Sequence, residues 1–192
     1  MPTRYLPLLA LLLGFTMAAC NSSKKDDAAP NTSRCTEYVA GDVAVGIKAT
    51  ADIDAVFAWI NSTGLHISQV NGFTYVSGLP ADSLAYVNRT LLAKPYLDAR
   101  GFKAGNAYVL AADRKIRVGD VLFDMTPANQ ADWLRTRQTL QLADEGAARC
   151  QSCKDIFLKV PVGVEKYWAQ ELARHPATSW AELNCIGQIV LH

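Results

Sequence analysis

The sequence predicts an α+β fold, on three observations. Segments whose apolar residues alternate, as in half-buried strands, take turns with segments whose apolar residues repeat every three or four positions, as in helices. Glycine, proline and helix-capping residues separate these segments at short intervals. The chain has 192 residues, 50% of them hydrophobic, which is enough to form the core of one domain or of two small ones.

The balance of charge narrows the classes of function. Lys and Arg number 19 and Asp and Glu number 18, which gives a formal net charge of +1. A nucleic-acid binder that neutralises phosphates needs a clustered excess of Lys and Arg, so we expect no nucleic-acid partner. The composition is also unlike that of a disordered, collagen-like or coiled-coil chain.

The first predicted unit is a strand, a helix and a second strand. Alternating apolar residues indicate strands over residues 42–48 and 65–70. Asp52 is a suitable N-cap for the helix between them, and Gly64 is suited to end that helix in a left-handed conformation. Trp59 lies off the apolar face of this helix, which makes it a candidate contact residue on the surface.

A hairpin is predicted next. Asn71-Gly72 is typical of two-residue hairpin turns, so we expect residues 73–79 to return as a neighbouring strand. A helix is expected next, starting at Asp82 or Ser83 and ending at Pro95. Two strands follow over 108–111 and 116–123, with a bulge at Gly119, and then a helix from Thr126-Pro127 to about Ala143. The last expected elements are a strand over 156–160, a helix over 164–174 and a strand over 178–191.

This order of elements has a known counterpart. Up to residue 111 it reads strand-helix-strand-strand-helix-strand, the ferredoxin-like βαββαβ order, and a further strand-helix-strand-helix-strand follows. Residues 45–70 and 157–183 form a weak internal repeat. If the repeat is real, it indicates two ferredoxin-like halves, over residues 35–115 and 116–192, that share or stack their sheets.

Residues 1–19 are predicted to be a signal peptide and not part of the fold. Their apolar run, of about 15 residues, is shorter than the roughly 20 that a membrane-spanning helix needs. Met17-Ala18-Ala19-Cys20 resembles the bacterial lipobox, with Met17 where that motif usually has Leu. The resemblance implies that Cys20 becomes a lipidated, palmitate-bearing N-terminus, so the partner at this end is a membrane. The alternative is an ordinary secretory signal with an incidental cysteine.

Residues 20–34 read as the lipidated cysteine and a flexible polar tether, followed by an α+β domain over residues 35–192. Lys24-Lys25-Asp26-Asp27 resembles the short export signal of surface lipoproteins in Bacteroidota. The resemblance implies a place in the cell envelope, on the outer membrane and exposed at the cell surface. A charged, solvated linker explains the same four residues equally well.

Four cysteines remain when Cys20 is set aside, and in an oxidising compartment an even number favours disulfides. They are Cys35, Cys150, Cys153 and Cys185. Three pairings are open, and we prefer Cys150–Cys153 with Cys35–Cys185. Cys150 and Cys153 also form a CxxC motif. It follows a helix and precedes a strand, the reverse of the thioredoxin context, which favours a structural disulfide over a redox centre.

No sequence motif predicts catalysis. The chain lacks the nucleophile elbow, the phosphate-binding loop, the HExxH zinc helix and the glycine-rich dinucleotide fingerprint. Its three histidines, His66, His175 and His192, are scattered, and neither His66 nor His175 has an acid or a nucleophile nearby in sequence. We therefore expect no cofactor, no metal and no enzyme activity.

One further resemblance bears on function. The strand over 156–160, the helix over 164–174 and the segment from His175 to Asn184 resemble the end of subtilisin propeptides and I9 inhibitors. That resemblance implies a ferredoxin-like fold and peptidase inhibition by a tail that enters the protease cleft. Here the chain departs from the pattern, because Asn184 continues into an apolar strand with Cys185.

These observations favour a lipid-anchored, non-enzymatic binding module with an unknown protein or ligand partner. An I9-like inhibitor and a CxxC thiol oxidoreductase are the alternatives.

Overall fold

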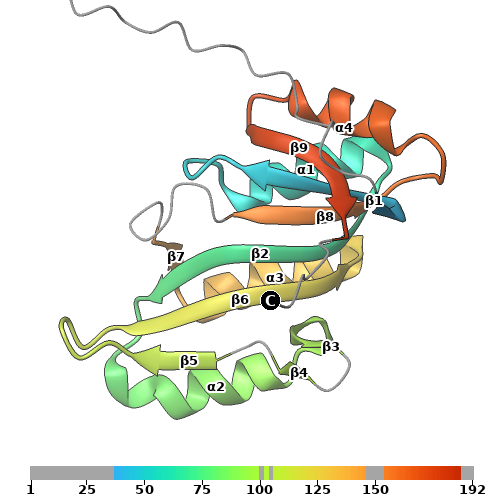
Figure 1. The fold of residues 1–192 in the computed structure, drawn as a ribbon. Coiled ribbons are helices and arrows are strands. Elements are labelled where there is room, and N and C mark those ends of the chain that lie inside the picture. The colour runs from blue at the N-terminus through green and yellow to red at the C-terminus, as the bar shows by residue number, and fades with distance from the viewer. Residues whose placement is uncertain (1–36, 100–101, 104–105, 146–153, 187–192) are drawn as a thin grey trace, which may run out of the picture.

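The computed structural model describes residues 37–99, 102–103, 106–145 and 154–186. Within these residues the fold is mixed α+β, with a seven-stranded antiparallel sheet, a separate two-stranded ribbon and four α-helices (Figure 1). The strands are β1 (Tyr38–Ile47), β2 (His66–Ser77), β3 (Asp98–Ala99), β4 (Phe102–Lys103), β5 (Asn106–Val109), β6 (Ile116–Met125), β7 (Leu142–Asp144), β8 (Asp155–Lys159) and β9 (Thr178–Cys185). The helices are α1 (Ile53–Thr63), α2 (Leu84–Leu92), α3 (Pro127–Thr139) and α4 (Glu165–Ala173), with 3₁₀ turns at Ala81–Ser83 and Pro95–Leu97.

The order of strands in the sheet confirms the α+β prediction and shows how the units interlock. The path is β5-β6-β2-β8-β1-β9, with β7 paired to β2 off this path. Strand β8 lies between β1 and β2, and β1 lies between β8 and β9. The units β1-α1-β2 and β8-α4-β9 are thus two strand-helix-strand crossovers that exchange strands, which is the ferredoxin-like arrangement.

The ferredoxin-like unit is built from the two ends of the described chain, in the segments where the sequence shows its weak repeat. Residues between β2 and β8 form an insertion, which widens the sheet because β6 pairs with the outer edge of β2 and β5 pairs with β6. The order of elements in the sequence predicted that this unit would lie within the first half of the chain. Instead, β1 and β2 both pair with β8, more than 80 residues further along the sequence, so the unit combines the two ends of the described chain.

Helix α1 has the predicted ends. The side chain of Asp52 accepts a hydrogen bond from the backbone N–H of Asp54 at 3.2 Å, and Gly64 closes the helix with φ of 73°. The α1 residues at helical spacing, Ile53, Val56, Phe57 and Ile60, are all buried. Helix α3 likewise has the predicted N-cap, Thr126, whose hydroxyl accepts a hydrogen bond from the backbone N–H of Asn129 at 3.2 Å.

The hairpin predicted at Asn71-Gly72 is wrong, because these residues lie inside the single long strand β2. Opposite them on β6, Asn71 faces Val121 and Phe73 faces Asp120, so Gly72 is an extra residue with φ of 75°. This is a β-bulge, which uses the same left-handed glycine as a tight turn does. The bulge therefore lies on β2, and the one expected at Gly119 of β6 does not form, since Gly119 pairs with Thr74 in register.

Helix α3 ends at Thr139, before the predicted Ala143. Gln141 has φ of 51°, which turns the chain so that Leu142 begins β7 against Ser77 of β2. The predicted last strand over 178–191 is described as far as Cys185, where β9 ends, and its residues 187–191 lie outside the described residues.

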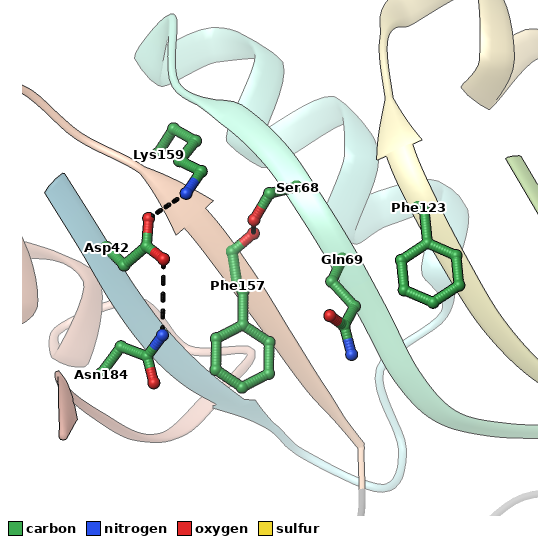
Figure 2. Close-up of a pocket in the computed structure, with 7 residues that line it drawn as sticks. All are labelled: Asp42, Ser68, Gln69, Phe123, Phe157, Lys159 and Asn184. Carbon is green, nitrogen blue, oxygen red and sulfur yellow. Dashed lines mark hydrogen bonds and ion pairs between the residues drawn. The ribbon is translucent and has the colours of Figure 1, made fainter. Parts of the chain in front are cut away.

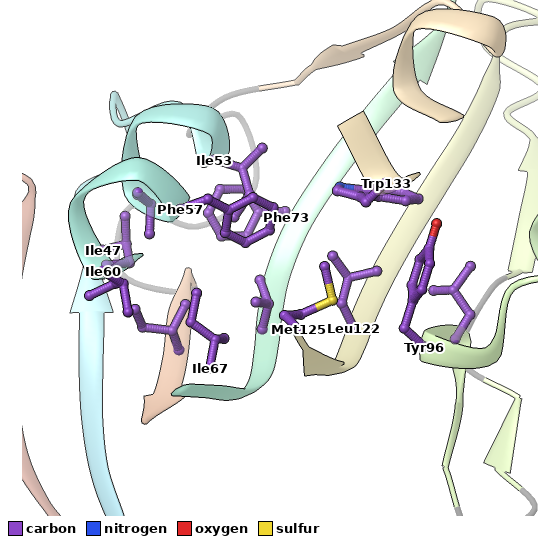
Figure 3. Packing of buried hydrophobic residues seen from close by; sticks show 14 of the residues in the cluster. Ile47, Ile53, Phe57, Ile60, Ile67, Phe73, Tyr96, Leu122, Met125 and Trp133 are labelled. Carbon is purple, nitrogen blue, oxygen red and sulfur yellow. The ribbon is translucent and has the colours of Figure 1, made fainter. Parts of the chain in front are cut away.

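The core lies on one face of the sheet. Buried residues from all four helices belong to a single apolar cluster with the inward side chains of the strands. Figure 3 shows part of this cluster, with Ile53, Phe57 and Ile60 of α1 on one side and Trp133 of α3 near Tyr96 on the other. At its centre the buried Trp133 of α3 packs edge-on against Tyr75 and Tyr96, with ring centroids 5.7 and 6.2 Å apart. Because the four described helices share this cluster, they cover the same face of the sheet, and none of them covers the other face, which we call the open face.

Candidate functional site

The open face of the sheet is identified by strand alternation. In β1, Val43, Val45 and Ile47 point into the core, so Asp42, Ala44 and Gly46 point to the opposite face. Residues opposite one another on neighbouring strands lie on the same face, so the pairing register extends this assignment across the sheet.

Two rows of residues cross the middle of the open face. The first row runs from β9 to β6 through Glu182, Ala44, Phe157, Gln69 and Phe123. The second row, two positions along each strand, runs through Trp180, Gly46, Asp155, Asn71 and Val121. The first row thus places Gln69 between two phenylalanines, and the second row places a carboxylate and an amide side by side.

A groove of about 570 Å³ lies over the first row and the sheet end next to it (Figure 2). We call it the open-face groove. Its lining comes from five strands and consists of Asp42, Ser68, Gln69, Phe123, Phe157, Lys159 and Asn184. It therefore offers two half-buried aromatic rings, two amides, a hydroxyl and an ion pair to a ligand, a mixture typical of binding sites.

One end of the open-face groove is held by an ion pair. Lys159 Nζ lies 2.5 Å from Asp42 Oδ1, and the other carboxylate oxygen of Asp42 accepts from the side-chain amide of Asn184 at 3.4 Å. The Ser68 hydroxyl donates to the backbone carbonyl of Phe157 at 3.0 Å, at a break in the β2–β8 register. These contacts join β1, β9, β8 and β2. The polar side chains at this end of the groove are therefore already held in position before a ligand binds.

An amide chain runs from the groove toward the second row. Gln69 Nε2 donates to Asn71 Oδ1 at 2.7 Å, and Asn71 Nδ2 donates to Asp155 Oδ1 at 2.6 Å. Burial raises the pKa of Asp155 above its ordinary value, and the hydrogen bond from Asn71 opposes that rise. Asp155 is therefore a partly desolvated carboxylate, oriented by Asn71, on the face that holds the groove.

The Trp180 side chain lies directly over Gly46 in the second row. A Cβ built on Gly46 would be 2.1 Å from Trp180 Nε1 and 2.2 Å from Cε2, so no side chain fits there. The indole is half-buried, and its position adds a third aromatic residue to the open face.

The residues singled out by sequence lie elsewhere. Trp59 is half-buried and stacks on His175, with ring centroids 3.8 Å apart and an interplanar angle of 6°, so it links α1 to the segment after α4. Burial lowers the pKa of His175. His66 Nε2 lies 2.9 Å from Asp124 Oδ1 near the protein surface. His192 lies outside the described residues.

Most of the predicted cysteine sites also lie outside the described residues, namely Cys20, Cys35, Cys150 and Cys153. Cys185 is described at the end of β9 and is disulfide-bonded. Lys154, which follows the CxxC motif, is buried with its Nζ 2.5 Å from Asp144 Oδ2, 3.1 Å from the Ala49 carbonyl oxygen and 4.6 Å from the centre of the Phe73 ring. No sequence signal pointed to this buried lysine.

Comparison with protein-family models, curated proteins and solved structures gives no match for this chain. Within residues 37–99, 106–145 and 154–186, no helix is both long and apolar enough to cross a membrane. Among the same residues, no three His, Cys, Asp or Glu side chains gather where they could hold a metal ion.

Proposed function

We propose that this protein is a lipid-anchored protein of the bacterial cell envelope that binds a partner through the open-face groove and has no enzymatic role. The observation that carries the proposal is the groove itself. Its two phenylalanines offer apolar contact, while Gln69, Asn184 and the Asp42–Lys159 pair offer oriented polar groups. A preorganised surface of this kind binds with little cost in side-chain ordering.

The N-terminal segment supports the envelope part of the proposal. Processing before Cys20 would place a palmitate-bearing anchor at the start of a polar segment that leads to the first described residue, Glu37. A flexible segment of about 16 residues has an r.m.s. end-to-end distance of about 22 Å. The domain would then stand off the outer membrane and present the groove in many orientations, at the cell surface if Lys24–Asp27 acts as an export signal.

Metabolic labelling tests the anchor. We expect the chain produced in a bacterial host with its own leader to incorporate labelled palmitate and to fractionate with membranes. Cys20→Ser should abolish both, while Cys35→Ser, which changes a cysteine beyond the motif, should leave both intact. Equal labelling of the Cys20→Ser chain would exclude this cysteine as the anchor.

Site-specific photo-crosslinking in cells tests the groove. A photoreactive amino acid at Gln69 should yield discrete crosslinked species that disappear when Phe157 is changed to Thr. The matched control position is Ala55, which is exposed on α1 on the opposite side of the sheet. Crosslinks of the same kind and amount from both positions would show that the groove is not the binding surface.

Peptidase inhibition is a second candidate, and the ferredoxin-like arrangement of β1-α1-β2 with β8-α4-β9 favours it. The resembling segment ends at Asn184, which lies in β9 and whose side-chain amide donates to Asp42, so a product-like tail would have to begin beyond it. Peptidase inhibition is tested by titrating a subtilisin-like protease with the domain and measuring the rate of substrate cleavage. Stoichiometric inhibition supports this candidate, and an unchanged rate at a large excess of the domain eliminates it.

A further inference from the structure

Trp180 presents one face of its indole away from the sheet. A Cβ built on Gly46 would lie 2.1 Å from Nε1, 2.2 Å from Cε2 and 2.5 Å from Cδ1 of Trp180. Three nearly equal distances to these bonded ring atoms are possible only above the plane of the ring, so the indole lies face-on over Gly46. Its opposite face therefore points away from β1, and the residue as a whole is half-buried. A flat aromatic surface of this kind can stack on a ligand.

The carboxylate of Asp155 lies beside this ring. Gly46 of β1 pairs with Trp180 of β9 on one side and with Asp155 of β8 on the other, in the order of strands that Figure 1 shows. Residues directly opposite one another on neighbouring strands have their Cβ atoms about 5 Å apart, so Asp155 begins about that far from the place where the indole covers Gly46. Asn71 Nδ2 donates to Asp155 Oδ1 at 2.6 Å, and no other donor in the described part of the chain contacts this carboxylate. Its second oxygen, Oδ2, can therefore accept a hydrogen bond from a ligand.

The negative charge on this part of the open face has no cationic partner among the described residues. Glu182 lies two positions from Trp180 on β9, so it is on the same face, and it is exposed. Neither Glu182 nor Asp155 forms an ion pair within residues 37–99, 106–145 and 154–186. Lys159 on the same face is already paired with Asp42, at 2.5 Å. Burial raises the pKa of Asp155 above its ordinary value, so a neighbouring cation would stabilise its ionised form.

A guanidinium group matches both the ring and the carboxylate. Trp is the aromatic side chain that binds cations best through the face of its ring. Guanidinium is planar and weakly hydrated, so it can stack on an indole while its N–H groups donate to a carboxylate at its edge. A Lys ammonium is a strongly hydrated point charge and does not stack in this way. Trp and Arg are also enriched among the residues that contribute most to the affinity of protein interfaces, which suits a side chain presented by a protein.

We propose that Trp180 and Asp155 bind the guanidinium group of an arginine side chain on a partner protein. The guanidinium stacks on the outward face of the indole and donates an N–H to Asp155, while Glu182 adds negative charge two positions along β9. Phe157 of the open-face groove lies two positions from Asp155 on β8, so a partner that covers the groove also reaches the indole. That the occupant is a protein rests on the proposed function. The preference for a guanidinium is tested without the partner.

NMR titration of the chain from residue 21 onward, which keeps every described residue, tests the ligand chemistry. The probe is N-acetyl-arginine N-methylamide, and the matched control is the citrulline analogue, which has nearly the same shape and no charge. We expect the arginine probe to shift the indole N–H resonance of Trp180 and the amide resonance of Gly46. Its Kd should be on the order of 10 mM, since one cation–π contact and one charge-assisted hydrogen bond carry the binding. The citrulline probe should bind at least about fivefold more weakly.

Two substitutions test the two parts of the site. Asp155→Asn keeps the size of the side chain and the acceptor for Asn71, and it should weaken binding of the arginine probe by about fivefold or more. Trp180→Leu should have an effect of similar size, with the Gly46 amide as the reporter. Asp82→Asn, at an exposed carboxylate in the 3₁₀ turn before α2, should leave the Kd unchanged.

The inference is overturned if the arginine and citrulline probes bind equally, or if Asp155→Asn leaves the Kd of the arginine probe unchanged. Equal or tighter binding of the corresponding lysine probe would overturn the choice of a guanidinium. Free arginine should gain less than about tenfold over the blocked probe, and a larger gain would assign the site to a free amino acid and overturn the partner protein.

The titration and the crosslinking from position 69 fail independently. Guanidinium binding with no groove-dependent crosslink would sink the proposed function, while the chemistry of the Trp180–Asp155 site stands. Groove-dependent crosslinks with no guanidinium binding would retain the proposed function and sink this inference.

Discussion

The indole of Trp180 lies so close over Gly46 that a Cβ on that glycine would be 2.1 Å from Nε1. The two residues face one another on neighbouring strands β9 and β1, on the open face of the sheet. Glycine is therefore required at position 46 by the packing of an aromatic side chain. This contact fixes one edge of the surface on which the open-face groove lies.

Gly46→Ala is expected to destabilise the domain by about 1–3 kcal/mol, since the new methyl group must displace the indole. Urea unfolding measures the free energy, and tryptophan fluorescence reports the displacement. Gly119→Ala on β6 is the matched control, because a Cβ there meets nothing within 4 Å. In a Trp180→Ala background the cost of Gly46→Ala should nearly vanish. A cost that persists in that background would contradict the contact.

Glu165 is expected to contribute to stability in a pH-dependent manner. Its buried carboxylate accepts from the backbone N–H of Gly41 at 2.8 Å and of Gly163 at 2.9 Å, and these hydrogen bonds lower its pKa. A lowered pKa in the folded state means that the stabilisation is present above the ordinary pKa of glutamate. It is lost as the pH falls through the folded-state value.

Glu165→Gln should therefore lower stability at pH 7 and reduce the loss of stability on acidification below about pH 4.3. Denaturant unfolding between pH 2.5 and 7 measures both effects. Glu182→Gln, on the open face, provides a comparison at an exposed carboxylate. If the Glu165→Gln protein has the same pH profile as the unsubstituted protein, the backbone hydrogen bonds do not control this titration.

Removing the partner of Lys154 is expected to be costly. Asp144→Asn leaves a buried ammonium without its carboxylate, which costs about 3–5 kcal/mol. Replacing Lys154 itself by Met removes the charge and keeps much of the volume, so it should cost less than Asp144→Asn. Lys166→Met, at an exposed position on α4, should be close to neutral. Thermal and urea unfolding rank the three variants, and a larger cost for Lys154→Met would contradict the argument.

The disulfide at Cys185 is expected to join the two ends of the domain. Cys185 faces Tyr38 across β9 and β1, and Cys35 is three positions before Tyr38 in the sequence. Peptide mapping without reduction should therefore recover Cys35 linked to Cys185, and Cys150 linked to Cys153. A disulfide that closes a loop of about 150 residues stabilises by up to about 5 kcal/mol. Recovery of Cys185 linked to Cys150 or Cys153 would refute the preferred pairing.

Local sequence chemistry predicted both ends of α1 and the start of α3. Asp52, Gly64 and Thr126 act through hydrogen bonds or backbone angles within a few residues, so their roles can be read from their neighbours. Strand alternation also predicted most of β1 and β8 and all of β9 as far as it is described. The Asn71-Gly72 hairpin failed because a left-handed glycine serves a turn and a bulge equally, and only the distant pairing of β2 with β6 decides between them.

The candidate site could not be predicted for a related reason. Its lining residues run from Asp42 to Asn184 and come from five strands, so their proximity depends on strand order and register. The sequence did carry a partial signal. Phe157 lies between two inward residues of β8, Ile156 and Leu158, so alternation alone places a large aromatic ring on the outer face. Strand order was needed to put Phe123 near it.

The central claim, that the open-face groove is the binding surface, is tested most directly by comparing partner capture by two double variants. Phe123→Thr with Phe157→Thr alters the groove, while Tyr86→Thr with Tyr167→Thr removes two exposed rings from helices α2 and α4. We predict that the helix variant captures from envelope extracts the same species that crosslink to the chain carrying the photoreactive amino acid at position 69. The groove variant should capture at most a tenth as much. Equal capture by the groove variant would contradict the account.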